Sequence, residues 1–265
     1  MFVLDTIRHR LKRGCETIAY PKGPAPALPD RHGGALKVDA SLCADGCTAC
    51  VAVCPTEAVT RPGAISLDLG RCLFCAACVA VCPTRAITQS GDHRMAVRRR
   101  DDLVLGAPGG EELRLAAALE KKLRNLFGRS LRLRQVSAGG CAACEADTNV
   151  LGTIGWDLVR FGIQFVASPR HADGLLITGP VTKNMELALR KTYDAVPEPK
   201  IVIAVGACAI AGGPFVGHAE VNNGADARLP VDLYIPGCPP HPLTILDGLL
   251  RLLDRLEKRK DTKPD

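Results

Sequence analysis

A duplicated cysteine motif in the first third of the chain constrains its fold more than any other feature. The segment Cys47-Thr-Ala-Cys-Val-Ala-Val-Cys-Pro-Thr-Glu-Ala-Val-Thr60 recurs as Cys75-Ala-Ala-Cys-Val-Ala-Val-Cys-Pro-Thr-Arg-Ala-Ile-Thr88, an offset of 28 residues. Because residue types and spacing repeat together, the segment is a duplicated unit. The 265-residue chain holds 13 cysteines in all, far above ordinary usage. Such a count indicates either a disulfide framework or metal ligation.

Reduced thiols are expected, and they favour metal ligation. The N-terminus from Met1 to Arg13 lacks the apolar core and small-residue cleavage site of a signal peptide, whereas a disulfide framework needs an oxidising compartment. The longest apolar stretch, Ile201 to Gly213, is too short and too rich in glycine to span a bilayer. We therefore expect a cytoplasmic chain.

The spacing within the repeat is that of two-cluster bacterial-type ferredoxins. The second half has C-x2-C-x2-C-x3-C-P spacing, in which three cysteines hold one 4Fe–4S cubane and the fourth binds the other. The first half has one extra residue in its first gap, which Gly46 can accommodate. Zinc is disfavoured, since zinc modules pair two C-x2-C knuckles and do not need the repeated Cys-Pro. The interleaving predicts two ligand sets: Cys43, Cys47, Cys50 and Cys82 for a first cluster, and Cys72, Cys75, Cys78 and Cys54 for a second.

The C-terminal half alternates strand and helix patterns, which predicts a parallel α/β sheet. Helical patterns are expected at about 144–160, 184–195 and 241–257. The expected strands are Leu131–Val136, Ile163–Ala167, Gly174–Thr178, Lys200–Val205 and Val231–Ile235.

Four further cysteines follow the expected strands. Cys141 and Cys144 come after the first strand, Cys208 after the fourth and Cys238 after the fifth. Open α/β sheets place their sites at the carboxyl ends of strands, and glycines flank each of these loops. The position predicts a third, dispersed site. Glu145 lies beside it, either as an acid that complements a helix dipole or as a group that tunes the site.

Several segments make the chain recognisable. From about 120 to 255 it resembles the small subunit of membrane-bound, energy-converting nickel–iron hydrogenases, of the formate hydrogenlyase type, and the related 20-kDa cluster-bearing subunit of respiratory complex I. The stretch from Thr17 to Leu105 resembles the two-cluster ferredoxin subunit of the same complexes, so the chain resembles a fusion of two neighbouring subunits. The segments that carry the first resemblance are Leu126-Phe-Gly-Arg-Ser-Leu131, Gly139-Gly-Cys-Ala-Ala-Cys-Glu145, Ser168-Pro-Arg-His-Ala-Asp173, Thr178-Gly-Pro-Val-Thr182, Gly206-Ala-Cys208 and Tyr234-Ile-Pro-Gly-Cys-Pro-Pro240.

The resemblance implies a flavodoxin-like parallel-sheet domain preceded by a small α+β ferredoxin module. It makes Cys141, Cys144, Cys208 and Cys238 the ligands of a third 4Fe–4S cluster, the one nearest the catalytic subunit. The C-x2-C spacing of the first pair is that of the hydrogenase branch, since complex I subunits carry two adjacent cysteines there.

An electron-transfer role follows from the resemblance, with no catalytic centre in this chain. It implies a soluble donor (a ferredoxin or a formate dehydrogenase module), a hydrogenase-type or complex-I-type large subunit, membrane subunits, and a peripheral position on the inner face of the cell membrane. One alternative is the same wiring in a complex-I-like quinone oxidoreductase or another complex without hydrogen chemistry. The other alternative is a free-standing carrier of electrons.

Charge and the remaining motifs exclude other partners. The formal charge of +6 counts cysteines as neutral, and each cubane with its four thiolates carries about −2, so three clusters leave little positive charge for nucleic acid. Neither nucleotide-binding glycine motif is present. Cys15 lies outside all three sets and is expected to be a spare thiol.

The expected organisation has five parts. In the first, apolar residues at helical spacing alternate with basic ones, which predicts an amphipathic helix on a membrane or partner, or a basic helix packed on its own protein. In the third, leucines over Glu111–Phe127 suit one helical face after a short strand. The parts are a basic, Pro-rich segment (1–38), the ferredoxin module (39–105), a helical connector (106–130), the α/β domain (131–257) and a charged tail (258–265).

Overall fold

The computed structural model describes residues 2–106, 113–127 and 130–256. Its larger part is a five-stranded sheet in the order β10-β9-β8-β6-β7. All four strand pairs are parallel, so the predicted parallel α/β sheet is confirmed. The strands are β6 (Leu131–Ser137), β7 (Ile163–Phe165), β8 (Gly174–Thr178), β9 (Ile201–Val205) and β10 (Leu233–Ile235).

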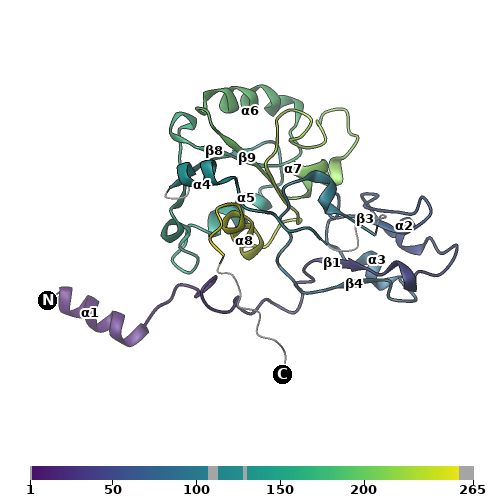
Figure 1. Ribbon diagram of the computed structural model, residues 1–265, viewed down its shortest axis with the longest axis horizontal. Helices are drawn as coiled ribbons and strands as arrows, with labels where there is room; N and C mark the ends of the chain where they lie inside the picture. The colour runs from purple at the N-terminus through teal and green to yellow at the C-terminus, as the bar shows by residue number, and fades with distance from the viewer. Residues whose placement is uncertain (1, 107–112, 128–129, 257–265) are drawn as a thin grey trace.

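Helices cover both faces of this sheet (Figure 1). Alternate residues of a strand point to opposite faces: Ile201 and Ile203 belong to the core beneath α5 (Ala143–Val150) and α8 (Pro242–Leu252). Val202 and Ala204 pack instead beneath α6 (Lys183–Ala195) and α7 (Ala207–Ala211). Burial on both faces explains why the strands are continuous apolar runs.

The cysteine repeat forms a separate group of short elements. Strand β1 (Leu36–Val38) pairs antiparallel with β4 (Ile87–Gln89). Strand β3 (Ser66–Asp68) pairs antiparallel with both β2 (Val59–Thr60) and β5 (Val104–Leu105). Two short helices, α2 (Ala49–Val53) and α3 (Ala77–Ala80), pack against each other. Helices and antiparallel strands together give the α+β module that was expected.

The module is joined to the α/β domain by backbone pairing as well as by packing. Val97 and Tyr234 exchange two backbone hydrogen bonds of 3.0 and 2.9 Å, and Arg98 Nε donates to the Asp232 carbonyl at 2.8 Å. One hydrophobic core contains Leu69 of the module and Ala209 of α7. The two parts are therefore continuous in the fold.

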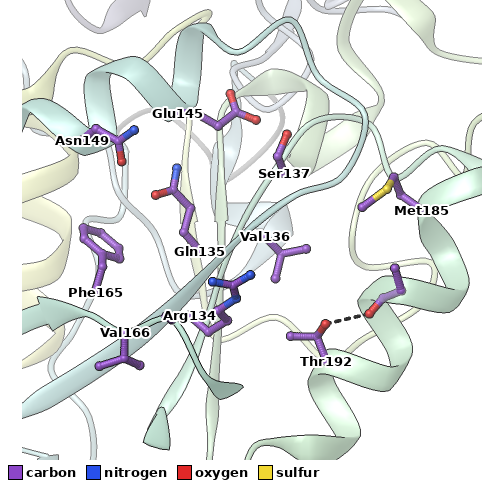
Figure 2. Close-up of a pocket in the computed structure, with 12 residues that line it drawn as sticks. Arg134, Gln135, Val136, Ser137, Glu145, Asn149, Phe165, Val166, Met185 and Thr192 are labelled. Atoms are coloured by element: carbon purple, nitrogen blue, oxygen red, sulfur yellow. Dashed lines mark hydrogen bonds between the residues drawn. The ribbon is translucent and has the colours of Figure 1, made fainter. Parts of the chain in front are cut away.

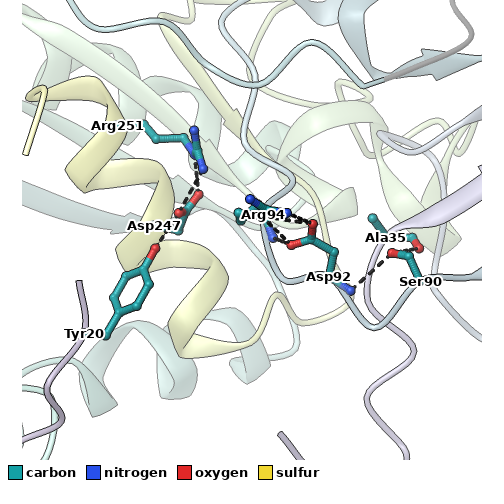
Figure 3. Close-up of polar contacts among 7 residues, drawn as sticks. All are labelled: Tyr20, Ala35, Ser90, Asp92, Arg94, Asp247 and Arg251. Atoms are coloured by element: carbon teal, nitrogen blue, oxygen red, sulfur yellow. Dashed lines mark hydrogen bonds and ion pairs between the residues drawn. The ribbon is translucent and has the colours of Figure 1, made fainter. Parts of the chain in front are cut away.

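The proline-rich segment runs along the α/β domain to the module. Tyr20 is buried, and its hydroxyl donates to Asp247 of α8 at 2.6 Å (Figure 3). Arg251, one turn further along α8, also donates to Asp247 at 2.6 Å. Nearby, Arg94 forms an ion pair with Asp92 just past the module. This polar network attaches the N-terminal segment to the domain.

Helix α1 (Phe2–Arg13) projects away from the rest of the molecule (Figure 1). The apolar side chains of its stripe are exposed: Val3, Leu4, Ile7 and Leu11 are 72, 74, 50 and 81% exposed. The prediction of a helix is confirmed. Of the two interpretations offered for it, packing on its own protein is contradicted by this exposure.

Three helix predictions need correction. Of the helix expected at Glu111–Phe127, only α4 (Lys121–Phe127) forms, and residues 111–112 lie outside the described part. Residues 113–120 are extended because their N–H groups bond elsewhere, for example Leu119 to the Leu252 carbonyl at 3.0 Å.

The helix expected at 144–160 ends at Val150, just before Gly152, and a short 3-10 helix follows at Leu158–Phe161. Helix α8 ends at Leu252 rather than at 257, a position outside the described residues. Helix α7 was not predicted, because five residues are too few for a periodic pattern.

Candidate iron–sulfur sites

The second half of the repeat folds around the start of α3. Ala76, between Cys75 and Cys78, has φ +60° and precedes the first helical residue. The left-handed turn reverses the chain within the C-x2-C loop. Phe74 also has φ +56°, and its N–H donates to Cys72 Sγ at 3.3 Å. A backbone donor aimed at a ligand sulfur is the arrangement that stabilises a negatively charged cluster.

Cys54 comes from the first half of the repeat but lies with the second set. It lines one cavity together with Cys72, Cys75 and Cys78. Its Sγ accepts the N–H of Ala58 at 3.2 Å. Burial, with repulsion from the neighbouring thiolates, raises the pKa of Cys72 to about 12 and that of Cys78 to about 11. These four side chains are brought together as the interleaved spacing requires.

The first set is assembled less completely by the described contacts. Cys43 and Cys47 lie close enough to Cys50 for their charges to act on it, and burial is the main cause that raises the pKa of Cys50. Cys82 follows α3, half-buried, with Thr84 Oγ1 at 3.8 Å from its Sγ. The described contacts do not link Cys82 to the other three, so its place as fourth ligand stays a prediction from spacing.

Gly46 has φ +69°, with open space where a Cβ would stand. Phe74 occupies the matching position of the second half with a similar φ of +56°. The left-handed turn therefore belongs to the repeat and is not specific to the inserted residue.

The four dispersed cysteines converge at the carboxyl ends of three strands. Cys141 follows β6, Cys144 lies in the first turn of α5, Cys208 in the first turn of α7, and Cys238 follows β10. Burial and the charges of the other three cysteines and Glu145 raise the pKa of Cys144 to about 12. Burial and repulsion from Cys238 and Cys141 likewise raise that of Cys208 to about 11. Four thiols that feel one another's charge form one site.

Glycines let the backbone approach these thiols closely. Gly206 has φ +89°, and a Cβ there would lie 2.5 Å from Cys144 Sγ. Gly213 has φ +56°, and a Cβ there would lie 2.7 Å from Cys208 Sγ. Side chains at either position would displace a ligand sulfur, so the cysteine loops fit a bulky cluster. The flanking glycines were the sequence signal for this crowding.

No three His, Cys, Asp or Glu side chains within the described ranges lie close enough to hold a single metal ion. A cubane does not require that convergence, because each thiolate binds a different iron of the cluster. The cavity lined by four cysteines, the convergent dispersed site and the backbone N–H donors all fit 4Fe–4S ligation.

Glu145 lies beside the third set, at the start of α5. Thr178 donates its hydroxyl to Glu145 Oε1 at 2.6 Å. Burial alone would raise the pKa of this carboxyl, but hydrogen bonds from Ser137 and Thr178 outweigh burial and lower it. The structure thus holds Glu145 as a carboxylate in a first helical turn, as the helix-dipole interpretation predicted.

An open cavity of about 690 Å³ lies next to Glu145 (Figure 2). Arg134 and Gln135 of β6 line one side, and Met185 and Thr192 of α6 line another. This cavity, next to the third site, is the hollow that the structure offers to another molecule there.

The comparisons with known proteins match both parts of the chain. Residues 141–252 match the family described as the NADH ubiquinone oxidoreductase, 20 kDa subunit. Residues 65–88 match the 4Fe–4S binding domain, so the N-terminal module is an iron–sulfur protein of the 4Fe–4S class.

Two relatives match the C-terminal half. The probable membrane-bound hydrogenase subunit mbhJ of Pyrococcus furiosus is 42% identical over 143 residues, 53% of this chain and 86% of that protein. The B-type subunit of the NADH-quinone oxidoreductase of Clostridium beijerinckii is 46% identical over 123 residues, 46% of this chain and 73% of that protein. The chain belongs to the family of the 20 kDa subunit of NADH:ubiquinone oxidoreductase.

A solved structure of the membrane-bound sulfane sulfur reductase, an archaeal respiratory membrane complex, has a chain 34% identical to this one. The match has a TM-score of 0.45 and covers 54% of this chain and 78% of that one. No helix in the described part of the protein is long and apolar enough to cross a membrane.

Proposed function

We propose that this chain is an electron-transfer subunit that carries three 4Fe–4S clusters between a low-potential donor and the nickel–iron large subunit of a membrane-associated hydrogenase complex. The observation that carries the proposal is the convergence of Cys141, Cys144, Cys208 and Cys238 from three strand ends onto one site. The first two clusters are assigned to Cys43, Cys47, Cys50 and Cys82, and to Cys72, Cys75, Cys78 and Cys54.

Bound 4Fe–4S clusters supply one-electron chemistry, and the protein supplies their spacing, burial and hydrogen bonds. Here the second and third sites are adjacent through packed residues. A Cβ at Gly70, two residues before Cys72, would lie 2.8 Å from Ile210 Cγ2, and Ile210 shares α7 with Cys208. This contact supports a path from the module into the α/β domain.

A large subunit is proposed to cover the third site. Cys141 and Cys238 are exposed, and the cavity beside Glu145 opens next to them in the fold. The C-x2-C spacing and the similarity to a membrane-bound hydrogenase subunit support the hydrogenase branch, of the formate hydrogenlyase type. A ferredoxin or a formate dehydrogenase module is the proposed donor.

The second candidate is a complex-I-like quinone oxidoreductase, or a related complex without hydrogen chemistry. It is favoured by the 46% identity to a subunit of an NADH-quinone oxidoreductase. The large subunit decides between them: a large subunit encoded beside this chain that lacks paired C-x2-C nickel ligands near both ends would exclude the hydrogenase. Purification as a stable monomer with no other subunits would favour a free-standing carrier instead.

The cluster count is tested by iron analysis. We expect about twelve iron atoms per anaerobically reconstituted chain, because three cubanes hold four each. A value of about eight or fewer would overturn the three-cluster proposal. Substitution of Cys208 by Ser should lower the count by about four, whereas the same substitution at Cys15 should leave it unchanged.

A peripheral position on the inner face of the cell membrane is proposed for the complex, and α1 offers a means of attachment. Its exposed apolar stripe is flanked by Arg8, Arg10 and Lys12. We expect the chain to sediment with vesicles that contain anionic lipid and much less with neutral ones, since each basic residue near such a surface contributes about 1 kcal/mol.

The double variant Leu4→Ser, Leu11→Ser should lower that vesicle binding about tenfold or more. Lys37→Gln, an exposed change in β1, serves as the control and should bind like the wild type. Equal binding of the wild type to both kinds of vesicle, or no loss in the double variant, would exclude α1 as a membrane attachment.

A further inference from the structure

Arg61 is the one side chain whose guanidinium is seen to donate to a ligand sulfur in the described part of the chain. Its Nη1 lies 3.3 Å from Cys43 Sγ. The same nitrogen lies 2.9 Å from the Ala44 carbonyl and 2.6 Å from the Cys47 carbonyl. Arg61 directly follows β2 and is half-buried. The cation is thus held against the Cys43–Cys47 loop, the loop that has one extra residue.

This contact is electrostatic as well as structural. A guanidinium keeps its positive charge at every pH relevant to proteins, and hydrogen bonds with a charged partner are about twice as strong as neutral ones. Reduction adds a negative charge to a cluster and its thiolates. A cation bonded to one of those thiolates stabilises the reduced state more than the oxidised state, and so raises the reduction potential.

The second half of the repeat has no such cation at the matching position. An offset of 28 residues takes Arg61 to Gln89, which is exposed and lies against Gly33. There the sulfur of Cys72 accepts a neutral backbone N–H, that of Phe74. Cys72 and Cys78 are each only 7% exposed, whereas Cys43 and Cys47 are half-buried. Burial disfavours added charge, so burial and charge act in the same direction.

We infer that Arg61 makes the cluster of the Cys43 set the higher-potential member of the module pair, so that a single electron entering the module resides there. The inference rests on the ligand sets of the proposed function. The step is a one-electron reduction by the external donor. It takes up no proton, because Arg61 stays charged in both redox states.

The test is a redox titration of the full, reconstituted chain followed by electron paramagnetic resonance, with iron measured in the same samples. In Arg61→Gln, which copies the second half, we expect the equilibrium constant for reducing the first cluster to fall about tenfold, or about 59 mV for one electron. The first cluster is identified as the signal altered by Cys43→Ser. Arg61→Lys keeps the charge but loses the planar fork, and should lower the constant about threefold.

Arg85→Gln is the matched control. Arg85 is exposed and lies three residues after Cys82, another ligand assigned to the first cluster. Its removal takes the same charge from the same neighbourhood without a bond to a thiolate, and should change the constant less than about twofold. A change as large as that in Arg61→Gln would overturn the role of the direct contact.

Three other results are decisive. Unchanged potentials in Arg61→Gln with full iron overturn the inference but leave the proposed function intact. If Arg61→Gln loses about four irons, Arg61→Lys decides: the threefold shift supports the inference, and an unshifted potential overturns it and leaves Arg61 as a brace for the loop. A wild-type chain with about eight irons or fewer refutes the proposed function itself.

Discussion

The same four residues, Cys-Ala-Ala-Cys, build part of a site in both regions of this molecule. In the module and in the α/β domain the first alanine is left-handed, with φ +60° at Ala76 and +67° at Ala142. In both, a helix begins at the second alanine, α3 in the module and α5 in the domain. The local geometry is therefore shared by two folds that otherwise differ.

The regions differ in how the remaining cysteines arrive. In the module they come from the same short repeat, and Cys54 needs only the contact between α2 and α3 to reach its set. In the α/β domain, Cys208 and Cys238 follow β9 and β10, which pair at Val205 and Ile235. The third site therefore depends on a correctly assembled sheet, whereas the first two depend on local loops.

The largest expected effect breaks the third site alone. Gly206→Ala places a Cβ about where Cys144 Sγ lies, 2.5 Å away. Because backbone fixes Gly206 between β9 and α7, the thiol must move. We expect reconstituted protein to lose about four of about twelve irons, with the signals of the module retained.

Gly217→Ala is the matched control for that variant. Gly217 also has a positive φ, +79°, but nothing lies within 4 Å of the added Cβ. Its backbone strain is comparable, so it should keep all its iron. Equal loss in the two variants would show that strain, rather than the approach of Gly206 to the ligand sulfur, sets cluster retention.

A smaller effect is expected where the module meets the α/β domain. Arg100 holds Asp68 through two hydrogen bonds of 2.8 and 2.6 Å and covers Gly70, next to Ile210 of α7. Arg100→Ala should lower the free energy of unfolding by about 1–3 kcal/mol, because a partly buried carboxylate loses its charged partner. Denaturant titration followed by cluster absorbance measures this change.

An exposed ion pair gives the control. Arg13 and Glu16 are 3.4 Å apart, with side chains 69 and 51% exposed. Arg13→Ala should leave the free energy of unfolding unchanged, because surface pairs contribute little. A similar loss in both variants would contradict a specific role for the Arg100 contact at the junction.

The sequence predicted the two regions to different depths for physical reasons. The ligand sets of the module could be proposed from spacing alone, since short loops limit which thiols can meet. The parallel sheet followed from apolar runs, but α7 did not, because its five residues carry no periodicity. The leucines before Lys121 suited a helix, yet tertiary bonds to Ala96 and Leu252 keep that segment extended.

Arg61 was missed for another reason. The repeat shows arginine at position 61 and glutamine at position 89, so the asymmetry between the halves is visible in the sequence. Nothing in that comparison says where the guanidinium points. Only the folded Cys43–Cys47 loop, with two carbonyls and a thiol facing one nitrogen, gives the substitution a consequence.

The smallest expected effect concerns pH at the segment that links the two regions. His93 packs edge-on against Tyr20, with ring centroids 5.7 Å apart, and His32 packs in the same way against His241 at 5.3 Å. Burial is the main cause that lowers the pKa of all three histidines below the usual 6.5. Around His93, Asp247 and Asp92 favour the charged form and Arg94 and His32 oppose it.

A histidine whose pKa is lowered by folding takes up its proton more readily in the unfolded chain. Stability is therefore full above about pH 6.5 and falls as the pH drops below that value. We expect the melting temperature of the loaded protein to fall between about pH 7.5 and about pH 5.5, and His93→Gln to remove about a third of that fall. His9→Gln, on exposed α1, should not alter it. If His93→Gln keeps the full pH dependence, the acid sensitivity belongs to the cluster sites and not to the link between the two regions.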